Sequence, residues 1–430
     1  MLKSIIGNFS VRFSTAVFNL LIAVFISQFL GAEGKGEQSL ILAAITIVLL
    51  FHNVVSGASI VYLASRIPAR KLLVVSYSWS IFVGLISYLI LVKLSFFNSF
   101  ITISIVTLSI ISSFTSINSS LLIGREKISK SNLINLTVPL FTLFFILLQF
   151  YCFKSKSISV YIYALFFSYL ISLALSLVYI KDYYSEKVAQ NAKFQTTFKS
   201  LLFFGFQNQL AHVFQLSSFR ISYFIIEHFE GKEAVGIYSN GVSIAEAIWM
   251  ITSSICLYLY SKISNSNDHD FAIQMTEKLT KVALLLSFLV ICIFVAVPSN
   301  FYPWVFGKEF FEIKSIILLI LPGIWIYNYY LIIGHFFSGQ GKYYVNAVAT
   351  GIGFLVTCIA AFIFIPTLRI QGAAISASIS YLITSLVVII YFCKEGARFV
   401  VFPSVQELSD SWIALKSHVL KSKKDHEENN

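Results

Sequence analysis

Apolar runs of about twenty residues follow one another along most of the chain, and short polar segments separate them. A helix needs roughly 20 apolar residues to cross the hydrocarbon core of a bilayer. The pattern therefore predicts an all-α polytopic membrane protein with twelve transmembrane helices. Their expected bounds are 9–30, 39–64, 72–94, 99–123, 131–153, 158–180, 200–227, 236–261, 275–298, 315–338, 344–365 and 370–393.

One polar segment between apolar runs recurs two hundred residues later. Residues 29–39 read FLGAEGKGEQS and residues 229–239 read FEGKEAVGIYS, with Phe, Gly, Glu, Gly and Ser at the five matching positions. A second echo links Gly124-x-x-Lys127 to Gly339-x-x-Lys342. Internal repeats in membrane chains indicate two similar helix bundles that frame a central transport site.

The repeat divides the chain into four expected parts. These are an N-terminal six-helix bundle at 1–180, a cytoplasmic linker at 181–199, a C-terminal six-helix bundle at 200–393 and a tail at 394–430. Within the tail, apolar residues recur at helical spacing behind a capping box, and lysines follow. This pattern predicts an amphipathic helix lying on the inner leaflet.

Composition and charge narrow the class of protein. The chain is 57% hydrophobic and 12% charged, which excludes a soluble protein of 430 residues. Of 31 Lys and Arg residues, 21 fall on the side of the N-terminus and 8 on the other side, so both termini are expected in the cytoplasm. The five Cys show no metal-binding or disulfide spacing, and we expect no metal, no other cofactor and no nucleic-acid partner.

Three formally charged residues lie well within the expected spans: Arg12, Arg220 and Glu246. Such groups are expensive in hydrocarbon and usually face a cavity or a partner. Glu246 lies about ten residues into its helix, near the midplane, and shares a face with Ser243. Two interpretations stay open for it: a cavity carboxylate that binds H⁺ or Na⁺ as coupling ion, or a salt bridge to Arg220.

Other polar residues inside the spans are further candidates for a substrate cavity. Asn208, His212 and Gln215 lie on one stripe of the seventh expected helix, and His52 and Asn53 lie near the middle of the second. The two-hundred-residue repeat places Arg12 opposite His212, so each half offers a potential cation at one level. Alternatives are snorkelling for Arg12 and hydrogen-bonded packing for His52.

Three segments resemble one transporter family. FLGAEGKGEQS follows the first expected helix, GIYSNGVSIAEAIWMI follows the seventh, and a third runs from VFGKEFFEIKS to GQGKYYVNA at 305–347. In this order they are similar to the signatures of the polysaccharide (O-antigen) flippases of the multidrug/oligosaccharidyl-lipid/polysaccharide (MOP) exporter superfamily. The resemblance covers most of residues 5–393.

That resemblance implies a V-shaped pair of bundles, as in MATE proteins, in a bacterial inner membrane. It implies transport of an undecaprenyl-pyrophosphate-linked oligosaccharide between leaflets by alternating access, for O-antigen, capsular or exopolysaccharide synthesis. A polysaccharide polymerase and a chain-length regulator are the implied partners. Arg12 would then contact the pyrophosphate head group. Peptidoglycan lipid flippases usually carry two further helices, which this chain lacks.

Two other functions, a multidrug antiporter and a membrane enzyme, remain to be compared with the residue pattern. A cation-coupled small-molecule (multidrug) antiporter of the same superfamily would be expected to show an acidic cavity, whereas these spans hold two Arg and one Glu. A membrane enzyme needs a sizeable outer loop with catalytic groups, and the longest expected outer loop, 299–314, holds only two Lys and two Glu as charged residues. The sequence therefore favours a transporter of an anionic lipid.

Overall fold

The computed structural model describes residues 2–154, 157–185, 194–264 and 268–399, and within these ranges the chain is almost entirely helical and contains no strand. The elements in chain order are α1 Leu2–His52, η1 Asn53–Val55, α2 Ala58–Leu63, α3 Ala69–Leu94, α4 Ser99–Gly124, α5 Ile128–Cys152, α6 Ser159–Ile180, η2 Lys181–Ser185, α7 Phe194–Glu246, α8 Trp249–Ser264, α9 His269–Ala296, α10 Phe301–Phe306, η3 Lys308–Phe310, α11 Ile313–Gly339 and α12 Tyr343–Lys394.

Eight helices are long and apolar enough to cross a membrane, and the bent pair α7 and α8 makes a ninth candidate. Three helices of 51 to 53 residues, α1, α7 and α12, contain one non-helical residue each. Straight helices of this length would measure about 77 Å, more than twice the hydrocarbon thickness. Each is instead a hairpin of two spans, so the described part of the chain makes the twelve expected crossings.

Contacts between the two arms show that these helices fold back. In α7, which turns at Gly231, the rings of Tyr223 and Tyr238 lie 5.8 Å apart and perpendicular to each other. In α12, which turns at Arg369, Thr357 Oγ1 donates a hydrogen bond to Ser380 Oγ at 2.7 Å. The turn of α1 is at Gly31. We call the end of the molecule that holds these turns the hairpin end.

Two expected helices are broken. The span expected at 39–64 is interrupted after His52 by η1 and by Gly57, whose φ of +54° is left-handed. The span expected at 236–261 bends by 44° between α7 and α8. Both segments keep an apolar composition through the break, so hydropathy alone predicts a continuous helix.

Several helix ends also differ from expectation. α7 begins at Phe194 rather than at 200, and α9 begins at His269 rather than at 275 because the Asp268 side chain accepts a hydrogen bond from Phe271 N and caps the helix. The short helix α10 was not predicted. The tail expected to form an amphipathic helix lies outside the described residues from 400 onward.

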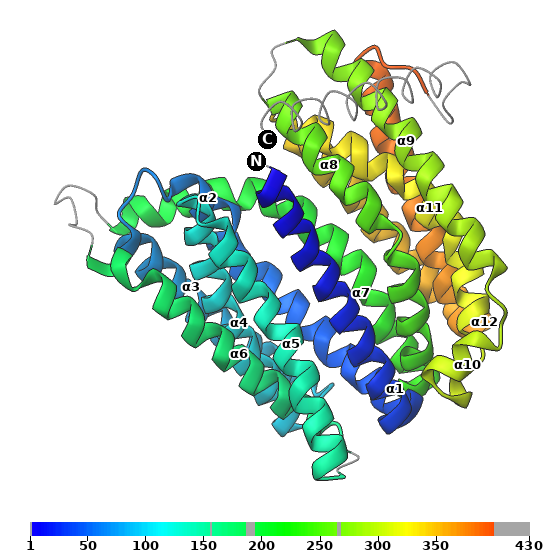
Figure 1. Ribbon diagram of the computed structural model, residues 1–430. Coiled ribbons are helices and arrows are strands. Elements are labelled where there is room, and N and C mark those ends of the chain that lie inside the picture. Colours follow the sequence, from blue (N-terminus) through cyan, green and yellow to red (C-terminus); the bar gives the residue numbers. More distant parts are fainter. Residues whose placement is uncertain (1, 155–156, 186–193, 265–267, 400–430) are drawn as a thin grey trace, which may run out of the picture.

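Figure 1 shows α2–α6 in one group and α8–α12 in another, with α1 and α7 between them. Two buried clusters fill the N-terminal group, and one large cluster fills the C-terminal group. The first turns of α7 belong to the N-terminal group, since Leu201 is buried there beside Leu72 of α3. α7 therefore spans both bundles and joins them.

Candidate functional site

An ion pair joins the two arms of the α7 hairpin. Arg220 Nη2 lies 3.3 Å from Glu246 Oε2, and Arg220 Nη1 donates a hydrogen bond to the Tyr223 hydroxyl at 3.0 Å. The second carboxylate oxygen of Glu246 is buried without a hydrogen-bond partner in the described structure. The two intramembrane charges thus form an ion pair between the two arms of one hairpin, which is the salt-bridge interpretation of the sequence.

Aromatic rings pack next to this ion pair. Trp249 of α8, Tyr327 of α11 and Tyr381 of α12 have ring centroids about 5 Å from one another. Gln215 of α7 donates a hydrogen bond to the Tyr327 hydroxyl at 3.1 Å. The cluster therefore connects the first arm of α7 to three other helices of the C-terminal bundle.

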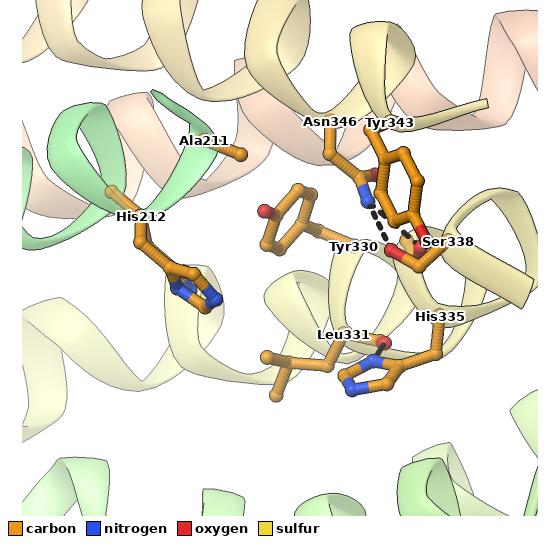
Figure 2. Close-up of a pocket in the computed structure, with 10 residues that line it drawn as sticks. Ala211, His212, Tyr330, Leu331, His335, Ser338, Tyr343 and Asn346 are labelled. Carbon is orange, nitrogen blue, oxygen red and sulfur yellow. Dashed lines mark hydrogen bonds between the residues drawn. The ribbon is translucent and has the colours of Figure 1, made fainter. Parts of the chain in front are cut away.

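A cavity of about 100 Å³, which we call the C-cavity, lies among α7, α11 and α12. Figure 2 shows His212 of α7 and His335 of α11 on opposite sides, with the ring of Tyr330 between them. His335 Nδ1 contacts the Leu331 carbonyl oxygen at 2.7 Å, and Asn346 Nδ2 donates to Ser338 Oγ at 2.9 Å. Its walls offer hydrogen-bond donors and acceptors, and among the described residues neither Asp nor Glu lines it.

A second cavity of about 260 Å³, the N-cavity, lies among α4, α5 and α6. Hydroxyl and amide groups dominate its walls, and no charged side chain in the part of the chain that the structure describes lines it. Its lining consists of Ser112, Thr115, Ser116, Ser119, Ser120, Ile123, Asn135, Val138, Tyr169 and Ser172.

The two cavities occupy equivalent positions of the internal repeat. The interval of 215 residues that relates Gly124 to Gly339 also relates five lining positions of α4 to five lining positions of α11. The pairs are Thr115 and Tyr330, Ser116 and Leu331, Ser119 and Gly334, Ser120 and His335, and Ile123 and Ser338. A hydrogen bond is repeated as well: Ser119 bonds Ser131 at 2.5 Å, and Asn346 donates to the Gly334 carbonyl at 2.8 Å.

The backbones of the two halves touch at the hairpin end. A Cβ atom on Gly36 would lie 1.7 Å from the Lys232 carbonyl oxygen, and one on Gly236 would lie 2.0 Å from the Ala32 carbonyl oxygen. No side chain fits in such a space. The recurring glycines of the two-hundred-residue repeat are therefore the points at which the second arms of α1 and α7 cross.

Hydrogen bonds complete this closure. Ser39 Oγ donates to Ser239 Oγ at 2.8 Å, so two matched residues of the repeat bond to each other. Lys35, which was expected in a polar segment outside the membrane, is only 5% exposed, and its Nζ donates to Gln38 Oε1 at 2.6 Å. In addition, Glu309 of η3 accepts a hydrogen bond at 2.6 Å from the backbone N of Ala32, just after the α1 turn.

The structure separates the candidate residues predicted from sequence. His212 and Gln215 line the C-cavity, whereas Arg220 and Glu246 form the ion pair. Ser243 is exposed and lines neither cavity. The side chains of Arg12 and Asn208 lie outside what the structure describes.

The two candidates on the second expected helix are packing residues of the break. His52 is fully buried and lines neither cavity, and neither ring nitrogen has a hydrogen-bond partner in the described structure. Asn53 Oδ1 accepts a hydrogen bond from Ser56 Oγ at 3.1 Å within η1. The sequence left two interpretations open for His52, a cavity residue or hydrogen-bonded packing, and neither cavity described above includes His52 or Asn53.

Sequence analysis missed the lining residues of α11, α12 and α4. His335, Tyr330 and Asn346 were passed over because they stand singly in apolar runs that are typical of buried packing. The serines of α4 carry no charge and so did not count as intramembrane candidates. The echo between Gly124 and Gly339 was the signal that could have aligned the two walls.

No model of a protein family matches the sequence. A sequence relative is the capsular polysaccharide biosynthesis protein CapF of Staphylococcus aureus, 23% identical over 223 residues. The match covers 50% of this chain and 55% of that protein, so the chain spans about half the length of the curated relative it matches.

Solved structures match over nearly the whole chain. The lipid II flippase MurJ in an inward closed conformation has a TM-score of 0.73 at 16% identity, covering 98% of this chain and 93% of that chain. A multidrug resistance MATE family transporter of the MOP superfamily gives 0.72 at 12% identity in its inward-facing conformation, covering 91% and 97%. An outward-facing MATE structure gives 0.65 at 13% identity, covering 91% and 93%. The chain therefore has the fold of MOP superfamily transporters, and the fold expected from the sequence resemblance is confirmed.

Proposed function

We propose that this multi-pass membrane protein is a flippase that moves a polyprenyl-pyrophosphate-linked oligosaccharide from the cytoplasmic to the outer leaflet. The observation that carries the proposal is a pair of polar cavities at equivalent positions of two bundles, in a molecule closed at its hairpin end. Polar cavities inside membrane-spanning segments mark substrate pathways. A site closed at one end and framed by two repeats is the geometry of alternating access.

The comparisons support the class of substrate. One similar structure is a flippase of lipid II, and the sequence relative is named for capsular polysaccharide biosynthesis. We infer that the cargo is a lipid-linked saccharide of a surface polysaccharide pathway, such as O-antigen or capsule. A polysaccharide polymerase and a chain-length regulator would then act on the product.

The positive-inside rule supplies the proposed orientation. With both termini in the cytoplasm of a bacterium, the hairpin end faces outward across the inner membrane. Both cavities lie away from that end. Their lining residues on α4 and α11 lie in the second halves of these helices, which end at Gly124 and Gly339 on the side opposite the hairpin turns. In this orientation the structure is closed outside, and the cavities lie in the cytoplasmic half.

The second candidate is a cation-coupled multidrug antiporter, because several structures of this fold are multidrug transporters. A site for cationic drugs is expected to present carboxylates, yet none of the described residues that line the C-cavity carries one, and Glu246 is already paired with Arg220. This observation favours the flippase. The coupling ion, H⁺ or Na⁺, remains a proposal for Glu246.

A reversible lock at the hairpin end tests the function directly. Ser39 Oγ and Ser239 Oγ are 2.8 Å apart, so a Ser39→Cys, Ser239→Cys pair is close enough for a disulfide. In proteoliposomes containing a fluorescent polyprenyl-pyrophosphate oligosaccharide, we expect oxidation to stop flipping and reduction to restore it. Each single-Cys variant serves as the control. Absence of flipping by the unmodified protein, with transport of a cationic dye instead, would support the antiporter.

A further inference from the structure

The walls of the N-cavity offer hydrogen-bonding groups without any charge. Five of its hydroxyls are already engaged. Ser119 bonds Ser131, and Ser112 bonds Tyr169. Thr115 Oγ1 donates to the Ile111 carbonyl, and Ser172 Oγ donates to the Ile134 carbonyl. These bonds fix the wall. They also leave other polar groups of the cavity available to an occupant.

Those available groups come from two helices. Ser120 is only 7% exposed, lines the cavity, and has no hydrogen-bond partner among the described residues. The Ser116 hydroxyl of α4 and the Asn135 amide of α5 also line it without a partner in the described structure. Ser120 is the buried member of this set, whereas Ser116 is half-buried and Asn135 is exposed. A buried hydroxyl is normally hydrogen-bonded, so a polar occupant of the cavity would satisfy Ser120.

Chemistry and size together select the occupant. Sites for divalent metal ions in proteins usually include carboxylate ligands, and no carboxylate of the described residues lines the cavity. A lipid chain would leave the hydroxyls unpaired. The volume of about 260 Å³ far exceeds the room for one water and is slightly below the usual range of small-molecule sites. A neutral ligand with many hydroxyls fits, and the ring of Tyr169 offers an aromatic wall for its apolar face.

We propose that the N-cavity binds one uncharged sugar unit through the hydroxyls of Ser116 and Ser120 and the amide of Asn135. This assignment rests on the proposed function, because the sugar would belong to the transported oligosaccharide. In this assignment the two bundles contact different parts of the substrate. The N-terminal bundle holds a neutral saccharide, and the C-terminal bundle presents histidines and the ion pair.

The internal repeat supplies a variant that fits the fold. Leu331 stands at the position of α11 that matches Ser116 of α4, so the repeated frame accepts a leucine there. Ser116→Leu fills the N-cavity and removes one hydroxyl. Thr107→Leu is the matched control, since Thr107 lies on the same helix, is exposed, and bonds its own helix at the Ile103 carbonyl.

Saturation-transfer NMR on the full chain in lipid nanodiscs measures binding, with neutral methyl glycosides of N-acetylglucosamine, galactose and glucose as probes. We expect saturation of at least one glycoside by the unmodified protein and by Thr107→Leu, and its loss in Ser116→Leu. Ser120→Ala, which removes one hydrogen bond with little change of volume, should weaken binding about three- to ten-fold. Pyrophosphate should not compete.

Contrary outcomes are distinct. Equal saturation in Ser116→Leu, or competition by pyrophosphate, would place the sugar elsewhere and overturn the assignment. No saturation with any glycoside, in a protein that still flips the lipid-linked oligosaccharide, would overturn the N-cavity site while the proposed function stands. Glycoside binding without flipping would leave the site in place and refute the flippase.

Discussion

The hairpins of α1 and α7 share one backbone arrangement but differ in their charged side chains. Both turn at a glycine with left-handed φ, +70° at Gly31 and +81° at Gly231, and they cross each other through matched residues. The positions of the α7 ion pair, Arg220 and Glu246, correspond in α1 to the uncharged Leu20 and Thr46. Turn and crossing residues recur because both hairpins need the same close approach. The Arg–Glu pair is not repeated at the matching positions of α1, where ions buried without partners would be costly.

The two cavities likewise share a backbone frame and differ in their side chains. Equivalent walls of α4 and α11 carry mainly hydroxyls in one bundle and a tyrosine, a leucine and a histidine among the matching positions of the other. The backbone frame that positions the wall is shared, as the hydrogen bonds of Ser119 and Asn346 show. A duplicated frame with divergent linings can therefore hold different parts of one amphiphilic substrate.

Breaking the α7 ion pair should have the largest effect. Arg220→Gln or Glu246→Gln alone leaves the other charge buried without its partner, and we expect a loss of about 3–5 kcal/mol in stability. The double variant should regain most of it. Thermal unfolding of the purified full chain measures all three. If the double variant is as unstable as the single variants, the pair is not a simple salt bridge. If the double variant regains stability but its flipping no longer depends on the coupling ion, that result would assign the coupling role to Glu246.

Separating the crossed hairpins should have a smaller effect. Gly36→Ala and Gly236→Ala each place a methyl group against a backbone carbonyl of the opposite hairpin, and we expect a loss of about 1–3 kcal/mol for each. The control is Gly351→Ala, whose Cβ meets Phe214 at an ordinary 3.4 Å. The same thermal measurement applies. Unchanged melting of Gly36→Ala would contradict the close crossing.

Making the C-cavity resemble the N-cavity should act on transport more than on stability. His335→Ser installs the residue found at the matching position of α4, Ser120. Because it removes one hydrogen-bonding ring, we expect flipping to slow about two- to ten-fold with little change in melting. Rates in proteoliposomes measure this. An unchanged rate would show that the two linings are interchangeable.

The smallest effect on stability and flipping is expected in the α1 hairpin, at the uncharged position that matches Glu246. Thr46 matches Glu246 in the repeat, yet its hydroxyl only bonds its own helix, at the Leu42 carbonyl, 2.7 Å away. Thr46→Val should change stability by no more than about 0.5 kcal/mol and leave flipping intact. A large loss in either assay would mean that the N-terminal hairpin contributes chemistry of its own.

Local pattern was enough to predict the spans. Hydropathy places every crossing near its place in the structure, and the repeat around Gly31 and Gly231 marks both hairpin turns. Local pattern could not reveal the breaks after His52 and Glu246, because apolar composition continues through them.

By itself, the sequence determined the class of protein, the number of crossings, the duplicated frame and the three charged residues that lie well within the spans. These depend on residue type and spacing, which fix how much of each segment must avoid water. Only the tertiary structure decided that Arg220 pairs with Glu246, that Lys35 is buried at the crossing, and that His335 faces His212. Such contacts join residues far apart in the chain, and their geometry follows from how hairpins pack, which no local pattern encodes.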